Sequence, residues 1–218
     1  MKLGFLVDLA KCIGCDACSV ACKIENSSPG TIWWAPVVHR EVGKFPKAKL
    51  QFLPTLCMHC EDPPCMHSCP TKAIAQRPDG IVLIDEQKCS GSRSCVSACP
   101  YNAISIWEEG MPTIYGEGYM TPLDELAQQK HRVGAAQKCT FCAHRVDLGK
   151  EKGLRPGVDR EATPACVLAC PVECRIFGDV EDPTSPVSKY LEEAERRKRT
   201  VFVLRPEANT RPKVAYLW

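Results

Sequence analysis

The stretch KCSGSRSCVSACPYNAI, residues 88–104, decides how this chain is interpreted. Its Cys89, Cys95 and Cys99, followed by Pro100, fall where an iron–sulfur ligand run of the form Cys-x2-Cys-x2-Cys-x3-Cys-Pro has its first, third and fourth cysteines. The second position of that run holds Ser92. Either the match is accidental, or the chain builds a cluster that lacks one cysteine ligand.

Three further groups of cysteines follow this pattern, the first with the same x2, x2, x3 spacing and the second with x2, x4, x3. In chain order the groups are Cys12, Cys15, Cys18 and Cys22; Cys57, Cys60, Cys65 and Cys69; Cys89, Cys95 and Cys99 with Ser92; and Cys139, Cys142, Cys166 and Cys170. A long insertion lies between the second and third cysteines of the fourth group. Repetition of this kind indicates a duplicated supersecondary unit.

The repetition extends to the residues around the cysteines. Asp-x-x-Lys-Cys at residues 8–12 recurs at residues 85–89, and CPTKAI at residues 69–74 matches CPYNAI at residues 99–104. Ser92 is therefore a substitution inside a true ligand run. The matching CPVECRI segment of the fourth group places Cys174 where the other repeats have alanine. We interpret Cys174 as a small buried thiol and not as a ligand.

Sixteen cysteines allow three chemistries: disulfides, zinc sites or iron–sulfur clusters. A disulfide framework is typical of short secreted chains, and a structural zinc site needs only two Cys-x2-Cys halves. The repeated four-position run favours iron–sulfur clusters. Three closely spaced cysteines reach one cluster, whereas the fourth is carried off by the next short helix and reaches a neighbouring one. We therefore expect the groups to work in pairs that exchange their last cysteines.

Length and charge narrow the classes further. A chain of 218 residues allows one substantial domain or two small ones. Its formal net charge of +2 argues against a nucleic-acid binder that relies on a broad basic surface. Apolar runs such as residues 81–84 are far shorter than the ~20 residues of a transmembrane helix, and the N-terminus lacks the pattern of a signal peptide.

Short elements are expected between the cysteine groups. Strands are predicted at residues 5–7, 51–53, 73–74, 81–84 and 201–204. The third and fourth of these flank Arg-Pro-Asp-Gly and predict a hairpin. Helices are predicted to start at Pro122 and at Pro186, and the second is expected to run to about Arg199.

Four such groups, with the insertion inside the fourth, resemble the four-cluster electron-transfer subunit of the molybdopterin (dimethyl sulfoxide reductase) superfamily. This is the small-subunit type of dimethyl sulfoxide, polysulfide, thiosulfate and tetrathionate reductases. The resemblance covers nearly the whole chain. It includes KCTFC at 138–142, PAC at 164–166, IFGD at 176–179, VLRPE at 203–207 and PKVAYL at 212–217.

The resemblance implies an α+β fold of two ferredoxin-like modules, one nested in the other, with short β-hairpins, cluster-binding loops and a few helices. Residues 57–108 form the implied inner module, and residues 1–56 with 109–218 form the outer module, docking segments and C-terminal tail. The implied ligand sets are Cys12, Cys15, Cys18 and Cys170; Cys139, Cys142, Cys166 and Cys22; Cys57, Cys60, Cys65 and Cys99; and Cys89, Cys95 and Cys69 beside Ser92. The first three sets imply [4Fe–4S] clusters.

Ser92 leaves three alternatives for the fourth cluster. Its oxygen could ligate iron, water or hydroxide could complete a four-iron cluster, or the cluster could lack that iron. Serine oxygen is a poor match for a site built on soft thiolates, and family members without cysteine at this position resemble the last case. We therefore hypothesise a [3Fe–4S] centre, with Ser92 as a weak ligand or no ligand.

The implied function is to pass single electrons between the molybdenum or tungsten pterin centre of a large catalytic subunit and an electron donor or acceptor. A membrane quinone-reactive subunit is a further implied partner, and no catalytic site is evident on this chain. Residues 23–56 and 109–138 exceed what two modules need and are predicted to dock the catalytic subunit. The compartment follows the partner, either periplasmic by co-export or cytoplasmic. A free polyferredoxin carrier is the alternative, although the balanced charge and extra segments favour a subunit.

Several polar residues lie beside the ligands in sequence. Four of them carry positive charge and are either ordinary solvated side chains or raise cluster potentials: Lys11, Lys88, Lys138 and Arg145. Three are histidines, which we expect in supporting or surface roles because no cysteine is missing where they lie: His59, His67 and His144.

Overall fold

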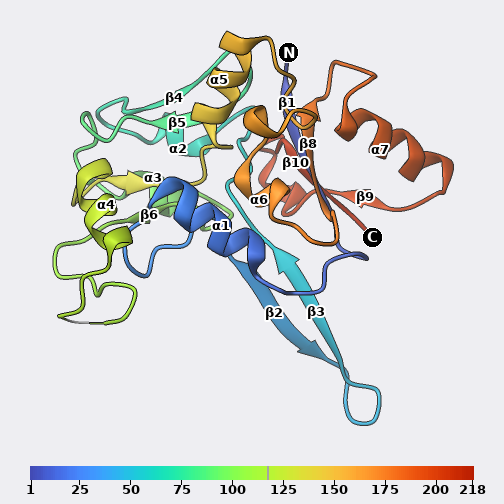
Figure 1. Cartoon of the computed structure of the whole chain (residues 1–218), viewed down its shortest axis with the longest axis horizontal. Coiled ribbons are helices and arrows are strands. Elements are labelled where there is room, and N and C mark those ends of the chain that lie inside the picture. The colour runs from blue at the N-terminus through green and yellow to red at the C-terminus, as the bar shows by residue number, and fades with distance from the viewer. Residues whose placement is uncertain (117) are drawn as a thin grey trace.

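Short helices and strands alternate with long cysteine-bearing loops in a mixed α and β fold (Figure 1). The computed structural model describes residues 1–116 and 118–218. Its helices are α1 (Ala17–Asn26), α2 (Pro64–His67), α3 (Ser94–Ala98), α4 (Pro122–Lys130), α5 (Ala143–Lys152), α6 (Ala165–Leu168) and α7 (Pro186–Arg196), with 3-10 turns at Arg160–Ala162 and Pro206–Ala208. Its strands are β1 (Leu3–Asp8), β2 (Val37–Val42), β3 (Lys49–Pro54), β4 (Ile74–Gln76), β5 (Val82–Ile84), β6 (Ser105–Ile106), β7 (Ala136–Gln137), β8 (Arg175–Asp179), β9 (Val201–Phe202) and β10 (Val214–Leu217).

A four-stranded sheet joins the two ends of the chain in the order β8-β1-β10-β9. Strand β1 pairs in parallel with β10 and antiparallel with β8. All of β1 is buried, because successive side chains point to opposite faces and both faces are covered. Leu6 packs toward Val187 of α7. Phe5, on the other face, lies 5.7 Å from Phe141 and 5.8 Å from Phe177 between ring centroids.

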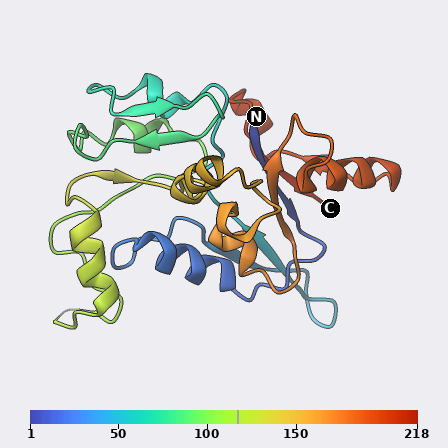
Figure 2. The same ribbon diagram turned by 45° about the horizontal axis from the view of Figure 1, so that its top comes forward.

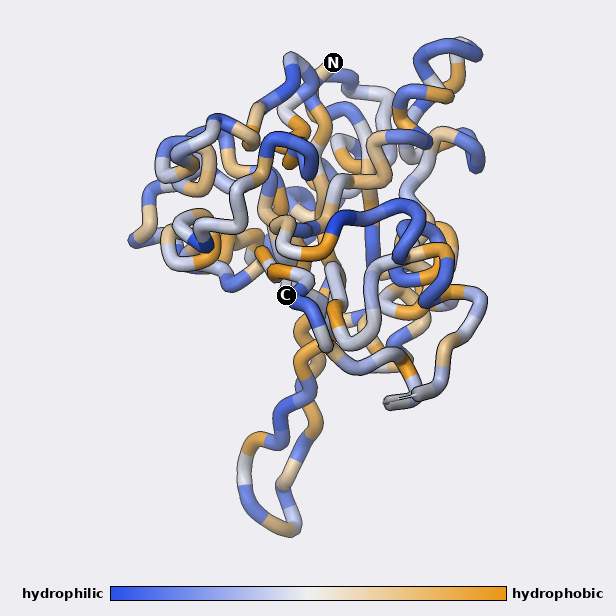
Figure 3. The backbone as a smooth tube through the Cα atoms, turned by 90° about the vertical axis from the view of Figure 1, so that its left-hand side faces the viewer, coloured by the Kyte–Doolittle hydropathy of each residue, from blue (hydrophilic) through white to orange (hydrophobic). Residues whose placement is uncertain are grey.

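The remaining strands form hairpins and one short pair. Strands β4 and β5 pair antiparallel, which confirms the predicted hairpin. Strands β2 and β3 form a longer antiparallel hairpin that projects from the body of the molecule as an arm (Figures 1 and 3). Strands β6 and β7 make a short pair from segments about 30 residues apart in sequence, which is a long-range contact that the local pattern did not predict.

The predicted helix starts are confirmed. Thr121 and Asp124 form a capping box at the start of α4, and the Ser185 side chain caps α7. Helix α7 ends at Arg196, earlier than expected, because Lys198 adopts a left-handed conformation with φ 55°. The Arg199 N–H then donates to the Ala194 carbonyl, which turns the chain back toward a shorter strand than predicted.

The main core contains cysteine thiols as well as hydrocarbon side chains. Buried cysteines from α1, α6 and the loops before β4 and α5 pack together with Phe5, Phe141 and Trp34. Figure 2 shows α1 and α6 side by side near the centre of the molecule, although they are far apart in sequence. Within residues 1–116 and 118–218, none of the helices combines the length and hydrophobicity that a membrane span requires.

A buried carboxylate ties β1 to α7 and the turn that follows it. Asp8 is fully buried and accepts two hydrogen bonds from the Arg199 guanidinium, at 2.6 and 2.7 Å. The Tyr190 hydroxyl donates a third at 2.7 Å. Burial raises the pKa of the Asp8 carboxyl, but the hydrogen bonds from Arg199 and Tyr190 outweigh it and hold that pKa below its usual value.

Arg199→Ala is expected to destabilise the fold, because it leaves the buried Asp8 charge without its cation. The expected loss is about 3 kcal/mol, or roughly 6–12 °C in the thermal unfolding midpoint. Arg197→Ala is the matched control, since Arg197 is 65% exposed and pairs with Glu193 on the surface. That variant should lower the free energy of unfolding by at most about 1 kcal/mol. Equal effects of the two substitutions, measured anaerobically by calorimetry, would contradict this account.

The contact between Asp8 and Arg199 also predicts how pH changes the difference in unfolding free energy between wild type and Arg199→Ala. A carboxylate whose pKa is lowered on folding stabilises the fold above its unfolded pKa, and this contribution is lost as pH falls through the folded pKa. The stability gap between wild type and Arg199→Ala should therefore narrow as pH falls below about 4.

Candidate iron–sulfur centres

The four cysteine groups have one backbone feature in common. The residue before the second ligand position has a positive φ in every group: Gly14 at 68°, His59 at 42°, Gly91 at 70° and Phe141 at 53°. The residue after that position is also left-handed in the first and third groups, at Asp16 and Arg93. Ser92 therefore occupies in space the position that Cys15 holds in the first group.

The Cys-Pro ends of three groups also match in their hydrogen bonds. The backbone N–H four residues after the cysteine donates to its sulfur in each case: Ala73 to Cys69 at 3.3 Å, Ala103 to Cys99 at 3.5 Å and Cys174 to Cys170 at 3.3 Å. The third residue after the cysteine is left-handed each time, at Lys72, Asn102 and Glu173. The predicted register of Cys174 is thus confirmed.

Four cysteines from two different groups surround one cavity. Cys57, Cys60, Cys65 and Cys99 line it, with Tyr101, Ile104 and Val82 among its other walls. Burial, followed by the proximity of Cys57, raises the pKa of the Cys65 thiol to about 12. Burial also raises the pKa of the Cys60 thiol to about 11. Cys99 belongs to the third group in sequence, but in space it lies with three cysteines of the second group.

A second cavity has three sulfur atoms and three hydroxyls in its lining. Cys69, Cys89 and Cys95 line it with Ser92, Ser90 and Thr71, and the other lining residues are Arg93 and apolar side chains. Here Cys69 comes from the second group, which completes the exchange between the second and third groups. The Ser92 hydroxyl is exposed and lies 3.3 Å from that of Ser94.

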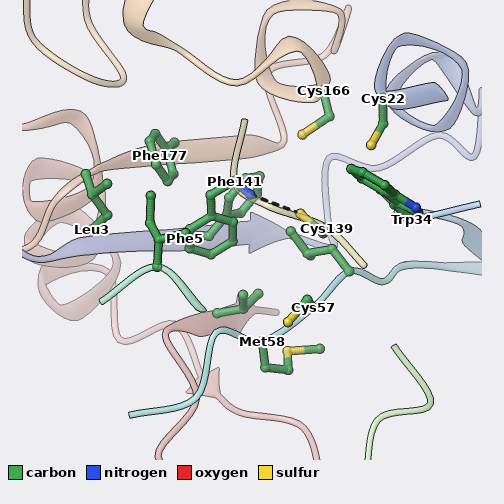
Figure 4. Packing of buried hydrophobic residues seen from close by; sticks show 14 of the residues in the cluster. Leu3, Phe5, Cys22, Trp34, Cys57, Met58, Cys139, Phe141, Cys166 and Phe177 are labelled. Atoms are coloured by element: carbon green, nitrogen blue, oxygen red, sulfur yellow. Dashed lines mark hydrogen bonds between the residues drawn. The ribbon is translucent and has the colours of Figure 1, made fainter. Parts of the chain in front are cut away.

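Cysteines of the first and fourth groups meet in the same way. Burial and then the nearby Cys139, Cys166 and Cys142 raise the pKa of the Cys22 thiol well above its usual range. Figure 4 shows Cys22, Cys139 and Cys166 converging from three different segments. Burial raises the pKa of the Cys139 thiol in turn, and the neighbouring Cys166 and Cys57 add to that effect.

The last cysteine of the fourth group lies near the first group. Burial raises the pKa of the Cys12 thiol, and the neighbouring Cys18 and Cys170 add to that effect. Cys15, between Cys12 and Cys18 in sequence, is exposed on the same loop. The Cys170 and Cys174 sulfur atoms are 3.5 Å apart, within hydrogen-bond distance, and this contact lowers the pKa of the Cys170 thiol to about 5.

These donor sets fit iron–sulfur clusters. Soft sulfur atoms and apolar walls are what such clusters require. In the described part of the chain, no three His, Cys, Asp or Glu side chains lie close enough together to hold a single metal ion. The raised thiol pKa values mean that cluster assembly must displace protons from sulfur, since a thiolate is the ligand.

The charged residues near the ligands divide into two kinds. Lys88 pairs with Asp85 at 3.1 Å, and Arg145 pairs with Glu25 at 2.6 Å, so their charges are largely neutralised by carboxylates. Lys138, in contrast, is buried and donates to the carbonyl of Cys139 at 3.0 Å and to that of Val82. Lys11 lies over the Tyr190 ring, 5.1 Å from its centroid.

The histidines take the places expected of residues that are not ligands. His67 and His144 are exposed and pair with Asp62 and Glu25, each at 2.7 Å. His59 is buried against Phe141, with 3.7 Å between ring centroids, and its Nδ1 accepts the Val82 N–H at 3.0 Å.

Arg175 is a residue that sequence reasoning did not single out. It opens β8 and is fully buried beside the cysteines, with no hydrogen-bond partner for any of its three side-chain nitrogens. The available signal was a charged residue at the head of the hydrophobic run Ile-Phe after a Cys-Pro turn. That signal has meaning only once burial is known, because most arginines at strand ends face solvent.

Two family models match the chain. A model described as a 4Fe-4S dicluster domain matches residues 11–73 and 88–174. A second model with the same description matches residues 48–113. Together they span all four cysteine groups, which supports iron–sulfur clusters as the cofactor.

Curated relatives align along the full chain. The arsenate respiratory reductase iron–sulfur subunit ArrB of Shewanella sp. (strain ANA-3) is 36% identical over 100% of this chain and 96% of its own length. The B subunit of tetrathionate reductase from Salmonella typhimurium is 35% identical over 99% and 72%. The B component of polysulfide reductase from Wolinella succinogenes is 34% identical over 87% and 83%. The protein therefore belongs to the family of iron–sulfur electron-transfer subunits of molybdopterin oxidoreductases.

Proposed function

We propose that this subunit holds four clusters in a row and passes single electrons along them, between the pterin–metal centre of a large catalytic subunit and an electron donor or acceptor. The proposed ligand sets are Cys12, Cys15, Cys18 and Cys170; Cys22, Cys139, Cys142 and Cys166; Cys57, Cys60, Cys65 and Cys99; and Cys69, Cys89 and Cys95. The observation that carries the proposal is the exchange of last cysteines between groups. Cys99 of the third group lines the cavity of the second group, and Cys69 of the second group lines the cavity of the third.

The same exchange supports two nested modules. The second and third groups trade cysteines only with each other in the described contacts, which fits an inner module of residues 57–108. The first and fourth groups, at the two ends of the sequence, exchange cysteines with each other. This fits an outer module of residues 1–56 and 109–218, of which residue 117 lies outside the described part.

The arrangement of the cysteines supports this order of the row. Cys18 of the first set, Cys166 and Cys139 of the second and Cys57 of the third lie in one buried cluster. Within it Cys18 contributes to the raised pKa of the Cys166 thiol, and Cys57 contributes to that of Cys139. The third and fourth sets share one hydrophobic cluster that includes Cys65 and Cys95. When bound, the clusters supply the one-electron centres, and the chain's residues bind them, hold them in this order and exclude water from the three inner junctions.

The fourth set supports a three-iron cluster. Ser92 stands at a ligand position by its backbone conformation, but its hydroxyl is exposed and faces Ser94. A hydroxyl is a weak replacement for thiolate at iron. The proposed cofactors are therefore three [4Fe–4S] clusters and one [3Fe–4S] cluster.

The partners proposed are a large molybdopterin catalytic subunit and, on the other side of the row, a membrane quinone-reactive subunit. The β2–β3 arm lies within residues 23–56 and carries exposed apolar side chains, among them Val38, Leu50 and Phe45, the last 95% exposed. Figure 3 shows hydrophobic and hydrophilic residues interleaved along the arm. Apolar side chains held out on an arm are typical of a surface that a partner covers.

Ser92→Cys is expected to convert the three-iron centre into a four-iron centre, because the backbone already presents residue 92 as Cys15 is presented. Iron and sulfide analysis with low-temperature EPR of anaerobically purified, oxidised protein measures the change. Ser92→Ala is the control and should keep the three-iron signal. An intact wild-type preparation without a three-iron signal would refute the assignment.

Cys174→Ala is expected to leave the iron content unchanged, since Cys174 stands at an alanine position. Cys18→Ala should lower the iron content by at least one iron, because one corner of its cluster loses its thiolate ligand. Metal analysis of both variants after identical anaerobic purification tests this. Loss of iron from Cys174→Ala would show that Cys174 is a ligand.

The arm should be protected from proteolysis by the catalytic subunit. Tryptic cleavage after Lys44 and Lys47, which flank the exposed Phe45, is expected to slow at least tenfold in the complex. Cleavage after the exposed Arg197, outside the proposed docking segments, serves as the control and should not change. Equal cleavage of the arm with and without the partner would exclude it from the interface.

A further inference from the structure

Arg175 holds a full positive charge in the interior of the protein. It is 2% exposed and opens β8 opposite Val7 of β1. Its guanidinium carbon lies over the Phe5 ring, 5.1 Å from the centroid. Its Nε, Nη1 and Nη2 atoms have no hydrogen-bond partner, and no salt bridge to Arg175 occurs in the described part of the chain.

Such a group is costly unless something compensates it. An arginine cannot lose its proton in a protein, and an unpaired buried charge is strongly destabilising even after the protein relaxes. The Phe5 ring offsets only a fraction of this cost, because a cation–π contact does not satisfy the N–H donors. A buried cation with five free donors therefore indicates an anionic acceptor that occupies the space beside it.

The side chains around Arg175 identify where that acceptor lies. Strand β8, which Arg175 opens, packs against α6, the helix that carries Cys166, and the Phe5 ring under the guanidinium shares one buried cluster with Cys166 and Cys18. These two sulfur atoms also raise the pKa of Arg175 against the opposing effect of burial. Cys166 and Cys18 stand in two different ligand sets, the second and the first. Arg175 thus lies at the junction between the first and second ligand sets, and both of its sulfur neighbours are proposed cluster ligands.

We propose that Arg175 bridges the clusters of the first and second ligand sets. It donates hydrogen bonds to sulfur of both clusters and raises the reduction potential of both. The inference rests on the proposed ligand sets. Each one-electron reduction adds a negative charge to a cluster, and a fixed cation in a water-poor site stabilises the reduced form more than the oxidised form. The planar guanidinium, with donors on several edges, can serve two acceptors at once, which an ammonium group does less well.

Lys138 provides an internal comparison. It is also buried, near the junction of the second and third sets, but its ammonium already donates to two backbone carbonyls. Arg175 has no such acceptors. The donors of Arg175 are therefore free for the clusters, whereas those of Lys138 are committed to the backbone.

The test is a potentiometric titration of the purified subunit complex, followed by EPR. In Arg175→Met, two four-iron clusters should become harder to reduce by at least tenfold in equilibrium constant, about 59 mV each for a one-electron step. The three-iron cluster at the far end of the row should keep its potential. Arg175→Lys should shift the two potentials less than the Met variant. Arg77→Met is the control, because Arg77 already pairs with Asp79 and Asp147, and it should shift none.

Two outcomes would overturn the proposal: unchanged potentials in an iron-replete Arg175→Met complex, or an equal shift of all clusters. If the Met variant does not assemble, pulsed EPR decides on wild type and Arg175→Lys labelled with 15N at arginine. A nitrogen coupling to reduced clusters that is present in wild type and lost in the Lys variant supports the bridge, and identical spectra refute it.

The ligand sets are tested separately from Arg175. Cys18→Ala and Cys166→Ala should each deplete a different cluster. If they do and no potential depends on Arg175, the row of clusters stands and only the bridging role fails. If both variants deplete the same cluster, the ligand sets fail and the bridging role fails with them.

Discussion

The convergence of sulfur atoms from distant parts of the chain is the constraint on which this structure depends. Cys22 and Cys139 come from opposite halves of the sequence and meet in the core. For such meetings to occur, the chain must return repeatedly to the same region, on short loops that contain left-handed residues. Regular secondary structure is brief because the loops, and not a continuous apolar layer, define the interior.

The local part of this design is readable in the sequence. Repeated cysteine spacing identifies the loops, Arg-Pro-Asp-Gly identifies the β4–β5 turn, and Thr121 with Asp124 identifies a helix start. Each depends on neighbours within a few residues, so propensity and spacing suffice. The end of α7 was misjudged because a charged helix face looks continuous until Arg199 turns away to reach Asp8.

The long-range part is not readable in the same way. The parallel pairing of β1 with β10 joins segments about 200 residues apart, and neither strand carries a mark of its partner. Lys88 and Arg145 lie close to ligands in sequence, but the structure provides carboxylates for both. Arg175 is the opposite case. Nothing in its sequence context singles it out, and it stands out only because its side-chain nitrogens are buried without hydrogen-bond partners among the described residues.

The segment at residues 211–216 couples the second cysteine group to the central sheet. The Lys213 N–H donates to the Met58 carbonyl at 2.9 Å, the Glu61 N–H to the Arg211 carbonyl at 2.9 Å, and the Tyr216 hydroxyl to the Pro54 carbonyl at 3.0 Å. This segment thus lies as a strap across the loop that holds the second cysteine group, and it continues as β10 beside β1. A displacement of β10 would therefore also disturb the hydrogen bonds that hold this loop.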